Sequence, residues 1–186
     1  LMKAGSFIAI IILGYVLRRR GFFKEEDFYV LSRIVLKITL PAAIVTNFTG
    51  IDMKPSMLLM SLLGLGGGII LTGMALLISA GKNGEEKAFN IINLTGYNIG
   101  NFTMPFAQSF LGPLGVVATS LFDSGNALVC LGGTYSVAVM AKGEKGKFSI
   151  MPIIKTLLSS VPFDAYLLMT ILSLLHLSLP SPVVSF

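Results

Sequence analysis

The sequence GYNIGNFTMPF, residues 96 to 106, is polar, rich in glycine and interrupted by a proline, yet strongly apolar segments flank it on both sides. A proline inside a helix cannot donate a hydrogen bond to the carbonyl four residues earlier, here that of Asn101, and its ring clashes with that carbonyl. Gly96 and Gly100 weaken a helix in the same region. We therefore predict that a helix over residues 88 to 111 is broken at Pro105, which suits the first turn of the second half.

The composition around this stretch is that of a membrane protein. Of the 186 residues, 54% are hydrophobic and 12% are charged, and the mean hydropathy is +0.83. A soluble globular domain does not have such a composition. Because a spanning helix needs roughly 20 mostly apolar residues, the sequence predicts an all-α integral membrane protein with six transmembrane helices, at about 4–18, 28–49, 56–80, 88–111, 114–140 and 162–180.

Lysine and arginine are distributed unequally between the predicted loops. Counted by alternate loops, ten lie in the first, third and fifth loops, whereas only Lys3 and Lys54 lie on the opposite side. Positive residues favour the cytoplasmic side, so we expect a multi-pass protein of the plasma membrane with its amino terminus outside. The net charge of +5 comes from these helix flanks and forms no basic patch with interleaved aromatics, so we expect no nucleic-acid partner.

The residues give little support for a metal site or for an enzyme. Cys130 is the one cysteine, which excludes an internal disulfide and a cysteine metal cluster, and we predict no metal site and no cofactor. Asp123 and Asp164 lack the glycine-x-glycine-aspartate signature of an intramembrane protease, and no serine nucleophile has a histidine partner. We therefore do not expect an enzyme.

Polar residues in a membrane-spanning helix cost free energy, so their presence in the broken helix calls for an explanation. Irregular backbone at membrane depth survives only where it contacts protein or lines a wet cavity. A broken helix also offers freed carbonyls to a cation and the positive amino end of its second half to an anion. We predict that Asn93, Asn98 and Asn101 bind substrate or line its path, while Gly96, Gly100 and Pro105 form the break. The alternative is a simple proline kink satisfied by neighbouring helices.

A lone acid lies near the middle of the fifth predicted span. Asp123 belongs to a polar stripe at helical spacing that includes Asn126 and Cys130. A charge at that depth costs at least a few kcal/mol unless it is paired, hydrated or protonated. We predict that Asp123 couples transport to H⁺ or Na⁺ and that Asn126, one turn further on, is a substrate or ion ligand. The alternative is a protonated aspartate that serves packing only.

Five stretches of the chain resemble the auxin efflux carrier family of secondary transporters, whose bacterial members include malate permease-like proteins. They are ILGYVLRRRGFF, LSRIVLKITLPAAIVTNF, GYNIGNFTMPF, FDSGNAL and the Leu179–Pro180 pair. The resemblance implies a fold of ten helices, built as two five-helix repeats of inverted topology, whose proline-broken fourth helices cross at the substrate site. Pro105 matches the proline of the first repeat.

The resemblance covers only the amino-terminal part of that fold. We expect residues 1–141 to form the first five-helix repeat, 142–161 a cytoplasmic loop with an interfacial helix, and 162–186 the first helix of an incomplete second repeat. The second broken helix is absent from this chain. We therefore expect either that the chain is a fragment of a longer protein, or that two copies associate as a homodimer to complete a site.

The function implied is secondary active transport of a small organic anion through the lipid bilayer by alternating access. Malate, another dicarboxylate, an amino acid and an indole acid all fit polar amides at a broken helix. A sodium-coupled carrier of the bile-acid type is an alternative within transport. An alternative from another class is a scaffold or interaction protein that packs through its small-residue helix faces and transports nothing.

Overall fold

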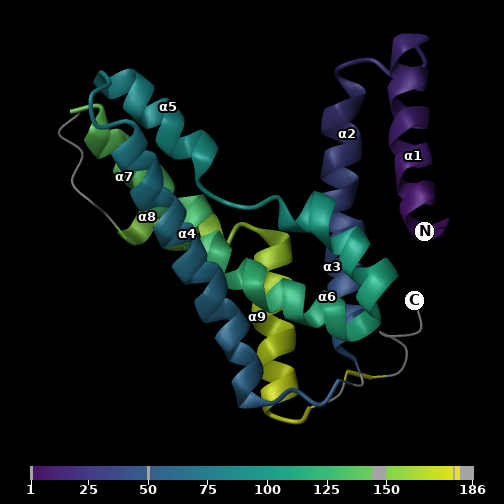
Figure 1. Ribbon diagram of the computed structural model, residues 1–186. Coiled ribbons are helices and arrows are strands. Elements are labelled where there is room, and N and C mark those ends of the chain that lie inside the picture. The colour runs from purple at the N-terminus through teal and green to yellow at the C-terminus, as the bar shows by residue number, and fades with distance from the viewer. Residues whose placement is uncertain (1, 50, 144–149, 178, 181–186) are drawn as a thin grey trace.

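The computed structural model describes residues 2–49, 51–143, 150–177 and 179–180, and every regular element within these ranges is helical (Figure 1). The prediction of an all-α protein is thus confirmed for the described residues. Three of the elements are short π-helical turns, each of which directly precedes an α-helix. In chain order the elements are α1 (Met2–Arg19), α2 (Asp27–Ile34), a π-turn (Val35–Thr39), α3 (Leu40–Phe48), a 3-10 turn (Pro55–Leu58), α4 (Leu59–Ile78), α5 (Gly84–Leu94), a π-turn (Ile99–Thr103), α6 (Met104–Leu128), a π-turn (Val129–Gly133), α7 (Thr134–Ala141), α8 (Ile150–Leu157) and α9 (Val161–Leu174).

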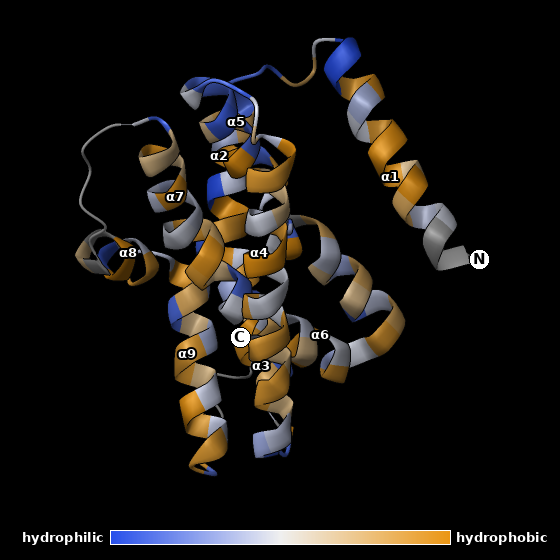
Figure 2. Ribbon diagram, turned by 60° about the vertical axis from the view of Figure 1, so that its left-hand side comes forward, coloured by the Kyte–Doolittle hydropathy of each residue, from blue (hydrophilic) through white to orange (hydrophobic). Residues whose placement is uncertain are grey.

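Three helical stretches in the described part of the chain are long and apolar enough to cross a membrane, namely Asp27–Phe48, Pro55–Ile78 and Met104–Ala141. Hydrophobic residues are frequent along these helices (Figure 2), and many of their large apolar side chains are exposed. The first two stretches correspond to the predicted spans 28–49 and 56–80. Helix α9, at 14 residues, is shorter than the predicted span 162–180, and α5, at 11 residues, covers only the first part of the predicted span 88–111.

The boundary predicted between the spans 88–111 and 114–140 lies at Gly112, where two helical segments meet. Gly112 has φ 68° and ψ −158°, outside the helical region, and Pro113 follows it. Glycine accepts this positive φ without strain, and a proline fits the first turn of the helical segment that follows. Gly112 therefore separates two helical segments, which correspond to the second half of the predicted fourth span and to the predicted fifth span.

The break in the predicted fourth helix lies upstream of Pro105. Helix α5 ends at Leu94, the chain is irregular to Asn98, and Gly96 has φ +105°. Pro105 occupies the first turn of α6, as predicted for the second half of the broken helix, because its missing N–H group is not needed there. The π-turn before it accommodates the proline, because the N–H of Met104 bonds the carbonyl of Ile99, five residues back. The position predicted for the break was therefore wrong by several residues.

Helices α3, α6 and α9 form the main core. Ile44 and Phe48 of α3, Val117 and Leu121 of α6, and Met169 of α9 are all at most 3% exposed and pack in one cluster. This packing brings α9 against helices that end more than thirty residues before it begins. It is what positions the side chains of α9 at the site described below.

Helix α4 lies against α6 through glycines on both helices. A Cβ atom at Gly64 would collide with the backbone oxygen of Phe122, and one at Gly125 with that of Ser61. The hydroxyls of Ser61 and Ser124 are 3.0 Å apart across the same contact. Gly64 and Gly125 therefore let the two helices approach closely, as small residues do in packed membrane helices.

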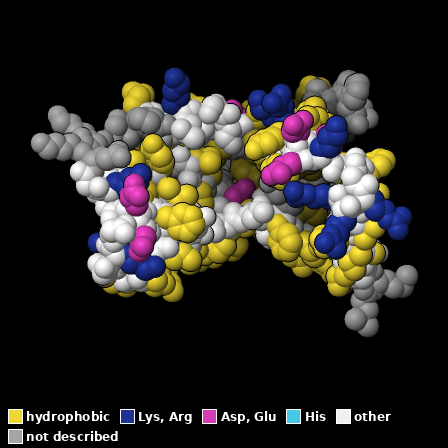
Figure 3. Space-filling model, turned by 90° about the horizontal axis from the view of Figure 1, so that it is seen from above, with side chains coloured by type: hydrophobic (Ala, Val, Ile, Leu, Met, Phe, Trp, Pro, Cys, Tyr) yellow, Lys and Arg dark blue, Asp and Glu magenta, His cyan; other side chains and the backbone are white. Residues whose placement is uncertain are grey.

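Several charged loops of the described residues lie at the same end of the molecule. In Figure 1 the loop between α1 and α2, the loop between α4 and α5, and the carboxyl end of α7 all lie at the upper end of the molecule. Seen from that end, lysine and arginine side chains lie on both sides of the molecule, with a hollow between the two sides (Figure 3). Lys145 and Lys147, which were counted in the fifth loop, lie outside the described residues.

Candidate functional site

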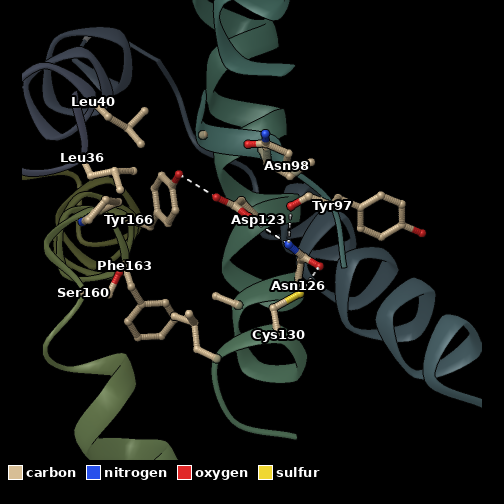
Figure 4. A pocket seen from close by; sticks show the side chains of 15 residues that line it. Leu36, Leu40, Tyr97, Asn98, Asp123, Asn126, Cys130, Ser160, Phe163 and Tyr166 are labelled. Carbon is tan, nitrogen blue, oxygen red and sulfur yellow. Dashed lines mark hydrogen bonds between the residues drawn. The ribbon is translucent and has the colours of Figure 1, made fainter. Parts of the chain in front are cut away.

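A cavity of about 190 Å³ lies where four elements meet: the π-turn that precedes α3, the irregular segment after α5, the carboxyl-terminal part of α6, and the start of α9 (Figure 4). Asp123, Asn126 and Cys130 reach it from successive turns of the α6 stretch, and Tyr166 reaches it from α9. The helical spacing of the first three residues explains why they share one side of their helix.

Asp123 accepts a hydrogen bond on each carboxyl oxygen. The hydroxyl of Tyr166 donates to Oδ2 at 2.9 Å, and the amide Nδ2 of Asn126 donates to Oδ1 at 3.1 Å. Hydrogen bonds to a carboxylate are roughly twice as strong as those between neutral groups. The two donors therefore compensate part of the cost of placing this side chain between helices.

Asn126 joins the irregular segment to α6. Its side chain is only 2% exposed, and besides Asp123 its Nδ2 contacts the backbone carbonyl of Tyr97 at 3.5 Å. Its Oδ1 accepts a hydrogen bond from the thiol of Cys130 at 3.1 Å. The amide thus has a partner for both its donor and its acceptor side, as a buried amide requires.

The irregular segment is held against α6 by close contacts. The ring of Tyr97 meets that of Phe122 edge to face, with centroids 5.3 Å apart. Gly96 approaches Cys130 so closely that a Cβ atom would collide with Sγ. Because Gly96 also has φ +105°, only a glycine fits this position without strain. The interruption is therefore a packed feature of the fold.

The structure brings some of the predicted site residues together and leaves others apart. Asn98 and Gly100 line the cavity with Asp123 and Asn126. Asn93 lies on the exposed side of α5, where its Nδ2 donates to the carbonyl of Phe89 at 2.8 Å.

Pro105 and Asn101 differ from the other predicted site residues. Pro105 is exposed in the first turn of α6 and does not line the cavity. The backbone of Asn101 belongs to the π-turn Ile99–Thr103, while its side chain lies outside the described residues.

Tyr166 is the residue at this site that sequence reasoning missed. It is 2% exposed and lies in the apolar helix α9. The sequence did contain a signal for this residue, because a tyrosine within an apolar span must find a partner for its hydroxyl. The sequence does not say that this partner is Asp123, which lies 43 positions earlier.

The cavity offers few groups for binding an ion. Neither a lysine nor an arginine is among its described lining residues, and no three His, Cys, Asp or Glu side chains of the described chain lie together in a way that could hold a metal. The carboxylate of Asp123 and the carbonyl of Tyr97 are oxygen groups of the kind that hard cations prefer. The arrangement can therefore carry one exchangeable proton or one weakly held cation.

Comparison with known families agrees with these features. The family model described as "Membrane transport protein" matches residues 5–170, which include the irregular segment and all four of the hydrogen-bonded side chains. No curated protein and no solved structure matches the chain. The match covers most of the chain, and this family includes the auxin efflux carriers that the sequence resembles. The chain therefore belongs to the membrane transport protein family.

Proposed function

We propose that this protein is a secondary active transporter that moves a small organic anion, such as a dicarboxylate, across the plasma membrane by alternating access. The observation that carries the proposal is the interrupted helix after α5, which lies against the hydrogen-bonded Asp123 and Asn126 in one cavity. In transporters, such interruptions provide polar backbone groups to substrates near the middle of the membrane.

An anionic group fits the amino end of the second half of the broken helix. The first N–H groups of a helix lack intrahelical partners and carry partial positive charge. Asn98, Ile99 and Gly100, where this half begins, all line the cavity, and the amide of Asn98 adds a hydrogen-bond donor. At about 190 Å³ the cavity is smaller than the roughly 300 to 1,000 Å³ of pockets for drug-sized ligands, which favours a small substrate.

The proposed coupling ion follows from the charge of Asp123. An anionic substrate and a carboxylate in one small cavity repel each other. Binding of H⁺ or Na⁺ at Asp123 removes this repulsion, so each ligand raises the affinity for the other. This mutual dependence is what coupled transport requires.

The orientation and the organisation of the chain are part of the proposal. The basic loops at one end of the helices support a cytoplasmic location for that end and an amino terminus outside. We retain the six spans, with 1–141 as one five-helix repeat, 142–161 as a connecting loop and 162–186 as the start of an inverted second repeat. The packing of α9 against α3 and α6 supports an early contact between the repeats.

Uptake into proteoliposomes tests the function. Vesicles that contain the full-length gene product are given labelled malate or succinate, with an inward proton gradient, an inward sodium gradient, or none. A transporter accumulates label faster than protein-free vesicles, and a gradient of its coupling ion accelerates uptake. As a control, Asn93→Ala should leave uptake unchanged, because this amide lies away from the cavity. A protein that folds and inserts but gives no uptake under any gradient would instead be a scaffold.

A further inference from the structure

A second cavity lies beside the one that contains Asp123. It has a volume of about 260 Å³ and lies between α4, α6 and α9. Two residues of α9, Phe163 and Tyr166, line both cavities. They are three positions apart and so share a face of the helix, and in Figure 4 both side chains extend from α9 towards α6. Phe163 and Tyr166 therefore form a partition between the two cavities.

The two cavities differ in chemical character. The first contains the carboxylate of Asp123 and the amide of Asn126, whereas the described lining of the second consists mainly of leucines and includes no charged side chain. Two hydroxyls of the second cavity, those of Ser61 and Ser124, pair with each other at 3.0 Å, and Ser124 also donates to the carbonyl of Leu121. Because these hydroxyls already have partners, the second cavity suits an apolar group.

The second cavity opens towards the outer surface of the helices. Leu62 on α4 and Leu128 on α6 both line it, and their exposed fractions are 62% and 41%. Both leucines lie in helical stretches that are long and apolar enough to cross a membrane, where lipid chains, which are as apolar as leucine, surround an exposed side chain. The partition therefore separates a polar cavity from an apolar space that adjoins lipid.

The two members of the partition are held in different ways. Tyr166 is 2% exposed, and its hydroxyl donates to Asp123 at 2.9 Å. Phe163 is only partly buried, and its side chain has no hydrogen-bonding group, so packing alone holds the ring. Phe163 is thus the member that can be truncated without loss of a hydrogen bond at the site.

We propose that Phe163 sets the size limit of the substrate, because its ring closes the Asp123 cavity towards the second cavity and so excludes anions with longer alkyl chains. This inference rests on the proposed function, since it concerns the substrate of the same site. A small polar anion fits within about 190 Å³. Without the ring, the chain of a longer monocarboxylate can enter the second cavity while its carboxylate stays in the first.

Binding of straight-chain monocarboxylates tests the partition. Equilibrium dialysis of the protein in lipid nanodiscs measures the dissociation constants of labelled butyrate and hexanoate, and empty nanodiscs correct for the label that dissolves in lipid. In the wild-type protein, hexanoate should bind no more tightly than butyrate. In Phe163→Ala it should bind about fifteenfold more tightly than butyrate, the gain that corresponds to burying two further CH₂ groups.

Two further variants control for loss of folding and for general loosening. Phe163→Val retains more of the side chain and should give an intermediate ratio of the two dissociation constants, so it carries the test if the alanine variant does not fold. Leu167→Ala truncates a residue that lines only the second cavity and leaves the partition in place, so it should keep the wild-type ratio. Thermal unfolding followed by circular dichroism checks that each variant is folded.

Three binding results would overturn the proposal. One is a ratio that both Phe163 variants leave unchanged, another is a wild-type protein that already binds hexanoate tenfold more tightly than butyrate, and the third is a wild-type protein that binds neither. Uptake of succinate into proteoliposomes separates this proposal from the transport function. Uptake together with an unchanged ratio refutes the size limit alone, whereas the expected change of ratio in a protein that takes up nothing refutes transport alone.

Discussion

The hydroxyl of Tyr166 on α9 donates a 2.9 Å hydrogen bond to Oδ2 of Asp123 on α6, across 43 positions of the chain. Tyr166 is 2% exposed, and its neighbours on α9 pack into the core with α3 and α6. A hydrogen bond between rigidly packed elements holds the carboxylate in one orientation. Helix α9 is therefore the element that positions the acid of the candidate site.

Tyr166→Phe removes this donor while it keeps the ring. We expect uptake to fall by about 10- to 100-fold, the range that corresponds to a hydrogen bond to a charged group. Proteoliposome uptake measures the effect, and circular dichroism melting checks that the helices are retained. Tyr29→Phe, at a tyrosine that is 68% exposed on α2, should leave both measurements unchanged. Equal uptake by the two variants would show that the hydroxyl of Tyr166 has no role in transport.

Asp123→Asn removes the charge but retains the size of the side chain. A neutral amide neither binds a proton near neutral pH nor attracts Na⁺, so we expect uptake that no longer responds to a proton or a sodium gradient. The measurement compares initial rates with and without each gradient. Asp164→Asn, at an exposed position of α9, is the control. If the Asp123 variant keeps the gradient dependence of the wild type, the carboxylate is not the coupling site.

Gly96→Ala tests the conformation of the irregular segment. An alanine must adopt φ +105° and its Cβ would collide with Sγ of Cys130. We expect destabilisation of roughly 1 to 3 kcal/mol, the usual cost of a strained backbone conformation, together with reduced uptake. Thermal unfolding followed by circular dichroism measures it. Gly66→Ala, where nothing lies within 4 Å of the new Cβ, should be neutral or stabilising. Equal melting temperatures for the two variants would contradict the assigned conformation.

Gly125→Ala tests the contact between α4 and α6. Its Cβ would enter the space held by the backbone of Ser61, so the helices must move apart. We expect a loss of about 1 to 3 kcal/mol, which is typical of overpacking. Gly73→Ala, on α4 with nothing within 4 Å of the new Cβ, is the control for a glycine replacement in a helix. A Gly125 variant as stable as this control would mean that the two helices are farther apart than described.

The sequence predicted an interrupted helix near residue 100, and the structure contains one. The glycines and the proline act on the backbone within a few residues, and such local preferences can be read from the chain. The place of Pro105 in the first turn of the second half was predicted correctly, but the irregular segment lies at residues 95–98 rather than at the proline. Packing of Gly96 against Cys130 and the π-turn before Met104 set this position.

Helical spacing also placed Asp123 and Asn126 side by side, and the structure places both in one cavity. The same reasoning failed to separate Asn93, which bonds its own helix, from Asn98, which lines the cavity. Periodicity shows which residues share a face of a helix, but not which face meets another helix once the chain has been interrupted between them.

The sequence alone was thus enough to predict the membrane character, the helical class and the family, because composition and short-range backbone preferences act over a few residues. The partner of Asp123 was decided only when α9 packed against α3 and α6, since a hydrogen bond between Tyr166 and Asp123 depends on the relative position of two helices. The cavity at Asp123 has the same origin, because its walls come from separate elements that meet only when the helices pack.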